Sequence, residues 1–174
     1  ATALIQLSRN ELDELDRNVN DLEDFLNYMG IECKLSMEKL PDGSKELYFV
    51  FKNRKAAFLE NASSGTLSLF NFYIRFLMSH KESSILYFDG FDAFFHFELS
   101  EKIIQYIKEK YKDSLVIFTT HNTNLMSNKI MRPDTLFILL TSGKLTPLCK
   151  ATDRELREGH NLGKLYMNGE FDED

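Results

Sequence analysis

Two carboxylates follow directly on a short apolar run near the middle of the chain. The run Ile85–Phe88 leads into Asp89, Gly90, Phe91 and Asp92. In open α/β sheets, ligands bind outside the carboxyl ends of the strands, so an acid at this position can hold a metal ion or a phosphate-bound metal. A strand that ends in an ordinary solvated Asp-Gly turn explains the same residues. This stretch alone does not decide between the two interpretations.

A group of small and hydroxyl residues precedes the most apolar helical segment. Ala62-Ser63-Ser64-Gly65-Thr66 leads into a segment predicted to be a helix over 67–80. Backbone N–H groups at a helix start are unpaired and the helix dipole favours negative charge there, so these residues can form an anion site. A plain Ser or Thr N-cap is the commoner explanation of such a pattern.

One histidine follows a second apolar run. The run 116–118 leads into Thr119-Thr120 and then His121. If the run is a buried strand, His121 lies at the same sheet edge as Asp89. A lone histidine after a strand is more often structural than catalytic. Together, however, an acid for Mg²⁺, a neutral imidazole and an anion-binding helix start are the parts needed to handle a γ-phosphate.

The first element that the pattern predicts is a helix over 8–29. Ser8 and Glu11 have the spacing of a capping box, and Gly30 is well placed to end the helix. Apolar residues recur at helical spacing, at Leu12, Leu15, Val19, Leu22, Phe25, Leu26 and Met29. A β-hairpin is expected next, with strands in 31–40 and 46–52 around the turn Pro41-Asp42-Gly43.

The rest of the chain alternates between strands and helices. The predicted elements are a buried strand over 85–88, a helix over 98–111, a buried strand over 114–119, strands over 135–140 and 144–149, a helix or two over 152–166, and an acidic tail over 170–174. Such alternation indicates an α/β fold with a largely parallel sheet.

Composition fits one globular domain with a substantial core. The chain has 174 residues, of which 43% are hydrophobic and 15 are Phe, and a net charge of −6 that argues against a general nucleic-acid-binding surface. Cys33 and Cys149 are far apart, which favours two reduced thiols in a cytoplasmic protein. We expect no membrane span and no secretory leader. The start at Ala1 suggests a piece of a longer chain.

Taken in order, three segments give the chain a family resemblance. Residues 62–66, 85–96 and 119–123 together resemble the C-terminal half of an ABC-type ATPase core, in particular the prokaryotic AAA-type ATPases related to RecF and SMC proteins, often found among phage-defence systems. The resemblance continues through 131–134 and 155–162 and so covers roughly residues 46–171. It implies the C-terminal lobe of a P-loop NTPase, with a mostly parallel sheet flanked by helices. Residues 1–45 then lead from a missing N-terminal half, 46–171 form the ATPase lobe, and 172–174 are a tail.

The resemblance also implies roles for individual residues. Ser63, Ser64, Gly65 and Thr66 resemble the signature motif, which in the family caps the γ-phosphate held by the opposite protomer of a head-to-tail dimer. Asp89 resembles the Walker B aspartate, which holds Mg²⁺ through its water shell. Asp92 and His96 fall in the D-loop, which reports across the dimer, and His121 resembles the switch histidine that touches the γ-phosphate and the attacking water.

Two departures from the family pattern affect this prediction. Gly90 occupies the position of the usual catalytic Glu, so either Asp92 or His121 activates the water, or hydrolysis is slow, or the position has been altered. No Gly-x-x-x-x-Gly-Lys-Ser/Thr occurs in the chain, and the stretch 159–165 has one spacer too few and lacks the hydroxyl. The resemblance therefore implies that the Walker A loop lies on the missing N-terminal half.

Three hypotheses about function follow. The first is the C-terminal part of an ATPase that binds ATP and Mg²⁺ at a dimer interface and switches the engagement of nucleic acid or an effector protein; this segment alone is expected to bind ATP weakly or not at all. The second is a non-hydrolysing module in which nucleotide only joins the dimer, favoured by Gly90. The third is a metal-dependent nuclease that uses Asp89 and Asp92 as direct ligands with Glu60 or Glu98.

Overall fold

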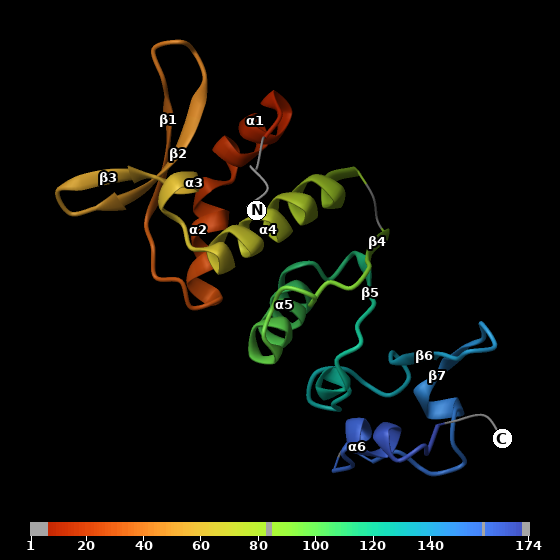
Figure 1. Ribbon diagram of the computed structural model, residues 1–174. Helices are drawn as coiled ribbons and strands as arrows, with labels where there is room; N and C mark the ends of the chain where they lie inside the picture. Colours follow the sequence, from red (N-terminus) through yellow and green to blue (C-terminus); the bar gives the residue numbers. More distant parts are fainter. Residues whose placement is uncertain (1–6, 83–84, 158, 172–174) are drawn as a thin grey trace. The chain divides into compact units, whose positions relative to one another are not determined.

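A computed structural model describes residues 7–82, 85–157 and 159–171, in a mixed arrangement of helices and small sheets. The chain divides into two compact units (Figure 1). The first unit is made of residues 1–87 and 113–117, and the second of residues 88–112 and 118–174. The predicted α/β class is confirmed, and the predicted tail 172–174 lies outside the described residues. Within the described residues, no helix is long and apolar enough to cross a membrane.

The first unit begins with two helices where one was predicted. These are α1 (Arg9–Arg17) and α2 (Val19–Tyr28), and the predicted capping box is confirmed. The Ser8 hydroxyl accepts a bond from the Glu11 amide at 3.3 Å, while the Glu11 carboxylate accepts one from the Ser8 amide at 2.7 Å. The prediction of a single helix was wrong because Asn18 leaves the helical region, with φ −120° and ψ 19°, and its side-chain amide donates to the backbone carbonyl of Glu14 instead.

A three-stranded antiparallel sheet follows these helices. It consists of β1 (Leu35–Lys39), β2 (Lys45–Phe51) and β3 (Arg54–Ala57), in that order. The predicted hairpin is confirmed, and its turn contains Gly43 at φ 85°, a conformation that glycine adopts without strain. The third strand was not predicted, and it returns after a two-residue turn that pairs Phe51 with Arg54.

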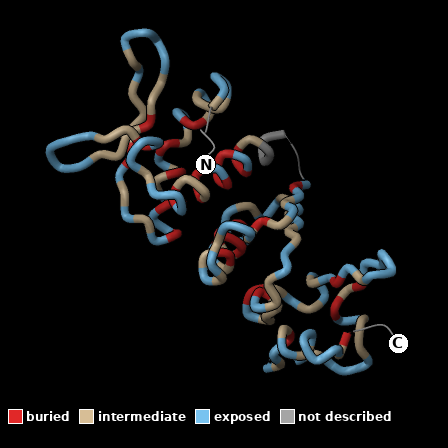
Figure 2. The backbone as a smooth tube through the Cα atoms, in the orientation of Figure 1, coloured by how far each residue is buried: buried red, intermediate tan, exposed pale blue. Residues whose placement is uncertain are grey.

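The long helix α4 (Ser64–Glu82) completes the core of the first unit, after the short helix α3 (Phe58–Asn61). Aromatic rings connect these elements: Phe58 lies 4.7 Å from Phe49 of β2 and 5.0 Å from Phe70 of α4, measured between ring centroids. Tyr73 packs on Phe25 of α2 at 5.3 Å. Each such buried side chain contributes roughly 1.5–3 kcal/mol relative to an exposed one. Buried residues accordingly gather on the inner sides of these helices (Figure 2).

The central strands β4 (Ile85–Phe88) and β5 (Leu115–Phe118) are present but are not buried as predicted. They form a two-stranded sheet in which alternate residues are exposed. The side chains of Ile85 and Tyr87 are 62% and 63% exposed, and those of Leu115 and Ile117 are 56% and 41% exposed. Strands that are apolar on both faces are typical of sheets covered on both sides, so the sequence pattern suggested burial. Among the described residues, these four side chains of the sheet are left exposed.

The second unit contains α5 (Phe97–Lys110), the hairpin of β6 (Phe137–Leu139) and β7 (Leu145–Pro147), and α6 (Leu162–Met167). Short 3-10 turns occur at Thr123–Leu125 and Leu148–Lys150. The prediction of a helix or two over 152–166 was wrong for most of its length, since α6 is the only helix among the residues of this range that the structure describes. The expectation of a largely parallel sheet does not extend to the hairpins: β1–β2, β2–β3 and β6–β7 are antiparallel because short turns join them.

Glycine has a packing role at the start of α6. A Cβ atom at Gly163 would lie 2.5 Å from the backbone carbonyl oxygen of Thr123, which is closer than real Cβ atoms approach. The absence of a side chain at this position therefore lets α6 pack directly on the turn Thr123–Leu125. Gly163 belongs to the stretch 159–165 that superficially resembles a phosphate-binding loop, and this close approach gives it a structural explanation.

Candidate functional site

The ends of β4 and β5 are joined through one threonine. The Thr119 hydroxyl donates to an Asp89 carboxylate oxygen at 2.5 Å and accepts a bond from the Gly90 amide at 2.8 Å. The backbone of Thr119 forms two further bonds, donating to the Phe88 carbonyl at 2.9 Å and accepting from the Phe91 amide at 3.3 Å. These four bonds fix the direction in which the Asp89 carboxylate leaves the strand.

The next threonine holds the second acid in the same way. The Thr120 hydroxyl donates to an Asp92 carboxylate oxygen at 2.6 Å and accepts from the Asn122 amide at 2.9 Å. His121 lies between these residues and is exposed, and its side chain makes no hydrogen bond to the described part of the chain. The structure therefore brings the segment containing His121 against Asp89 and Asp92, as predicted from the strand ends, but the connection runs through the threonines.

The backbone conformation at position 90 explains why this residue is glycine. Its φ is +55°, in the left-handed region that L side chains rarely adopt, and nothing lies within 4 Å of an added Cβ. A non-glycine residue in this conformation costs about 1–2 kcal/mol. The residue type at this position is thus explained by the turn that carries Asp89 into the following segment.

The segment between Asp92 and α5 is a pair of consecutive turns. Backbone bonds of 3.0 Å close the turns, from the Ala93 amide to Gly90 and from the Phe95 amide to Asp92. Phe94 projects from this segment with 84% of its side chain exposed. His96 is also exposed, and its carbonyl accepts the first bonds of α5 while its ring caps nothing. Of the predicted D-loop residues, His96 therefore presents its side chain to solvent, whereas Asp92 is partly buried and bonded to Thr120.

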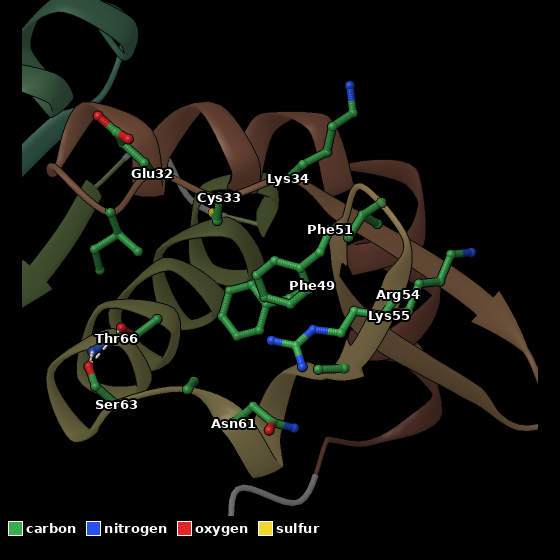
Figure 3. Close-up of a pocket in the computed structure, with 14 residues that line it drawn as sticks. Glu32, Cys33, Lys34, Phe49, Phe51, Arg54, Lys55, Asn61, Ser63 and Thr66 are labelled. Carbon is green, nitrogen blue, oxygen red and sulfur yellow. Dashed lines mark hydrogen bonds between the residues drawn. The ribbon is translucent and has the colours of Figure 1, made fainter.

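The predicted signature residues lie in the first unit, at the start of α4. The Ser63 hydroxyl accepts a bond from the Thr66 amide at 3.1 Å and lies 2.8 Å from the Thr66 hydroxyl (Figure 3). This is an ordinary N-cap, the simpler of the two interpretations of this segment. Thr66 is buried, whereas Ser64 and Gly65 are exposed. Ligand contacts from this segment are consequently open to the exposed residues Ser63, Ser64 and Gly65, and to the unpaired amides of the first helical turn.

Asp89 is suited to a magnesium ion that is bound mainly by other groups. It is exposed, and one carboxylate oxygen is engaged by Thr119. Mg²⁺ in phosphate-handling sites keeps several waters and takes one or two carboxylates together with phosphate oxygens, so a single acid fits this arrangement. The nuclease hypothesis needs a further carboxylate beside Asp89 and Asp92; over the described ranges, no group of three or more His, Cys, Asp or Glu could hold a metal ion.

Sequence reasoning missed the two threonines and the exposed phenylalanine. Thr119 and Thr120 were recognised only as neighbours of His121. One sequence pattern could have indicated their role. Two hydroxyl residues directly follow one predicted strand, and two acids follow the strand before it. Phe94 could have been noticed as a large apolar residue between Asp92 and His96, two polar residues expected to be exposed.

Comparison with known proteins gives the family. A family model described as "AAA domain, putative AbiEii toxin, Type IV TA system" matches residues 5–127. The chain belongs to this AAA domain family. The match includes α1, α2 and the three-stranded sheet, so the family extends further toward the N-terminus than the resemblance over 46–171 suggested. Among curated proteins, none matches the chain.

One of the similar solved structures, with a TM-score above 0.5, supports the fold. A chain from work on ATP-driven dimerisation and DNA-stimulated activation of SMC ATPases is 19% identical, with a TM-score of 0.54 over 82% of this chain and 89% of that one. An Smc head with a coiled coil and joint from Pyrococcus yayanosii is 17% identical, with a TM-score of 0.47 over 66% of this chain and 23% of that one. An SmcHead bound to the C-winged helix domain of ScpA is 18% identical, with a TM-score of 0.46 over 64% and 35%. The chain is an AAA-type P-loop ATPase domain with a fold similar to the SMC head.

Proposed function

We propose that this AAA domain supplies the signature, Walker B, D-loop and switch-histidine parts of a shared ATP site, and that a different segment supplies the Walker A loop. The observation that supports this most strongly is the pairing of both acids with the threonines beside His121. An acid after one strand and an exposed imidazole after the neighbouring strand then belong to segments that are hydrogen-bonded to each other. This arrangement suits the handling of a terminal phosphate.

In this proposal each residue of the second unit has one task. Asp89 holds Mg²⁺ through its water shell, and the ion neutralises charge on the phosphates when it is bound. His121 contacts the terminal phosphate or the attacking water from an exposed position. Thr119 and Thr120 do not touch the nucleotide; they keep the acids in place. The exposed Ser64 and Gly65 of the first unit offer amides to the terminal phosphate of a nucleotide held by a second copy.

A second copy of the chain is the proposed partner at this site. Phe94 is the most exposed of the large apolar residues identified in the structure, at 84%, and it lies between Asp92 and His96. An exposed aromatic ring beside polar groups is a common feature of protein interfaces. It supports a head-to-tail dimer in which the D-loop segments meet. Nucleic acid or an effector protein remains the proposed target of the switch.

Gly90 supports the alternative of a module that binds nucleotide without turnover. Glycine cannot accept a proton or orient water, and its left-handed backbone disfavours a Glu in its place. In this alternative ATP only holds two copies together. The two functions differ in one measurable quantity, the rate of phosphate release by the intact protein at saturating ATP.

Phosphate release by the intact protein tests the proposal. We expect turnover that falls by at least about tenfold in Asp89→Asn and His121→Ala, as for loss of a positioned catalytic group. A further variant, Gly90→Glu, adds a carboxylate at the position of the usual catalytic Glu. Gly90→Ala is its matched control, because it carries the same backbone strain without the carboxylate. Turnover that is unaffected by Asp89→Asn and by His121→Ala would contradict the proposed site, and absence of turnover with nucleotide-dependent dimerisation intact would favour the passive module.

ATP binding to the 174-residue chain alone provides an independent test. Most phosphate contacts of such a site come from the Walker A loop, which this chain lacks. We therefore expect calorimetry to give weak binding or none. A dissociation constant of the order of 1 µM, which corresponds to about −8.2 kcal/mol, would contradict the division of the site between segments.

A further inference from the structure

Helix α6 packs directly on the turn that follows His121. Only Asn122 separates His121 from this turn, which spans Thr123–Leu125. A Cβ atom at Gly163 would lie 2.5 Å from the carbonyl oxygen of Thr123 and 3.3 Å from its carbonyl carbon. Both atoms belong to the backbone, which cannot rotate away as a flexible side chain can. The small size of Gly163 therefore decides how close the backbone after His121 lies to α6.

Helix α6 is in turn held by the core of the second unit. Leu162, its first residue, is fully buried, and the side chain of Asn161 caps the helix by accepting a bond from the Lys164 amide at 2.9 Å. Met126, directly after the turn, packs against the same buried cluster as Leu162. The other buried members of this cluster are Ile138, Leu148 and Phe171. Because the helix and the turn share one core, α6 can serve as a fixed support for the segment that carries His121.

A chain of hydrogen bonds leads from the turn back to Asp92. The Asn122 side-chain oxygen accepts a bond from the Asn124 amide at 3.1 Å and so caps the turn. The Asn122 amide donates to the Thr120 hydroxyl at 2.9 Å, and that hydroxyl donates to Asp92 at 2.6 Å. His121 thus lies between two residues that are held by these bonds. Its ring makes no hydrogen bond to the described part of the chain, so the backbone that carries the ring determines where the imidazole can reach.

We propose that Gly163 and Asn122 are positioning residues for His121, with α6 as the support through which they act. The inference rests on the proposed contact of His121 with the terminal phosphate or the attacking water. Neither Gly163 nor Asn122 touches the nucleotide. With a Cβ at position 163, the Thr123 carbonyl oxygen has to retreat by about 1 Å to reach an ordinary contact distance of 3.4 Å. A displacement of about 1 Å lowers a catalytic rate by up to about 100-fold when it reaches a reacting group.

Amide NMR and hydrogen exchange of the chain test the positioning directly. Gly163→Ala is expected to move the amide signals of His121, Asn122 and Asn124. Gly159→Ala is the matched control and leaves them unchanged, because nothing lies within 4 Å of its added Cβ. Asn122→Ala removes the acceptor for the Asn124 amide, whose exchange then accelerates by about 2–10-fold. Asn122→Asp keeps an acceptor oxygen and is expected to restore the wild-type rate.

Phosphate release by the intact protein tests the consequence for turnover. Gly163→Ala is expected to lower kcat by at least about tenfold and to leave the KM for ATP within about twofold, because only the position of His121 changes. Asn122→Ala is expected to lower kcat as well, and Asn122→Asp to restore it. In a His121→Ala background, Gly163→Ala causes no further loss, since the group that it positions is already absent. A residue with a merely structural role would lower turnover in both backgrounds.

Failure of this inference is distinguishable from failure of the proposed function. If His121→Ala lowers turnover but Gly163→Ala does not, or lowers it equally in both backgrounds, the positioning role is wrong. Unmoved amide signals of residues 121–124 in Gly163→Ala overturn it without reference to ATP. If His121→Ala itself leaves turnover unchanged, the proposed role of His121 is wrong and this inference fails with it. The pair Asn122→Ala and Asn122→Asp provides the same test if the spectrum of Gly163→Ala lacks the dispersion of a folded protein.

Discussion

Replacement of Thr119 by valine tests the hydrogen-bond network that holds Asp89. Valine has nearly the same shape but lacks the hydroxyl, so the bonds to the Asp89 carboxylate and from the Gly90 amide are lost together. The backbone bonds of Thr119 to Phe88 and Phe91 remain. The change therefore isolates what the hydroxyl contributes.

The expected magnitude follows from the two bonds. A bond between neutral groups contributes about 0.5–1.5 kcal/mol, and one to a charged group about 1.5–3 kcal/mol. Asp89 is exposed, so water replaces most of the bond to its carboxylate, whereas Gly90 is only partly exposed. The sum is about 1–2 kcal/mol for local opening at this site, which corresponds to a factor of about 5–30 in the opening equilibrium.

Hydrogen exchange at the Gly90 amide measures this opening directly. A site-specific assay is needed because the chain has two compact units, and a single melting temperature would mix them. Exchange at Gly90 is expected to accelerate about 5–30-fold in Thr119→Val and to return close to the wild-type rate in Thr119→Ser. Thr120→Val is the matched control, since it releases Asp92 but leaves the Gly90 bond intact. The reasoning fails if Thr119→Val changes Gly90 exchange by less than twofold, or if Thr119→Ser exchanges as fast as Thr119→Val.

Three further predictions concern packing, thiol reactivity and the interface. Gly163→Ala forces a Cβ against a backbone carbonyl and is expected to cost about 1–3 kcal/mol. The cost is seen as faster hydrogen exchange of the α6 amides, whereas Gly159→Ala, with nothing within 4 Å, leaves that exchange unchanged. Equal exchange in the two variants would contradict the close approach. Burial, and to a smaller extent a nearby acid, raises the pKa of the Cys33 thiol to about 11, so at pH 8 iodoacetamide labels the exposed Cys149 first, and faster labelling of Cys33 in a peptide map would refute this. Phe94→Ser is expected to change the free energy of unfolding by no more than about 0.5 kcal/mol relative to the wild type. It is also expected to weaken ATP-dependent dimerisation of the intact protein, measured by sedimentation. Unchanged dimerisation would show that the ring lies outside the interface.

Local chemistry made parts of the fold predictable from sequence. The capping box at Ser8 and the turn at Gly43 depend on residues only a few positions apart, so their patterns were sufficient. The break at Asn18 depends on a hydrogen bond from its side-chain amide to a backbone carbonyl of the preceding turn. The spacing of apolar residues contains no information about such a bond. Burial of the central strands was wrong for a different reason: apolar residues show that a surface can be covered, but they do not show that another element covers it.

The candidate site was predictable to the level of strand ends but not of individual bonds. Asp89 and His121 each follow an apolar run, and strand topology was enough to expect them at one edge. The roles of Thr119 and Thr120 depend on the register between β4 and β5, which decides the hydroxyl that meets each acid. A shift by one residue would turn the hydroxyl of Thr119 to the opposite face. Sequence alone contains little information about that register.

The uncovered side of β4 and β5 has a practical consequence for handling the protein. Ile85, Tyr87, Leu115 and Ile117 present large apolar side chains on the two strands of one small sheet. Surfaces of this kind recruit strands from other molecules and promote precipitation. When expressed alone, the chain is therefore expected to become less soluble as its concentration rises, and a segment that shields this surface would act as an intramolecular chaperone for it.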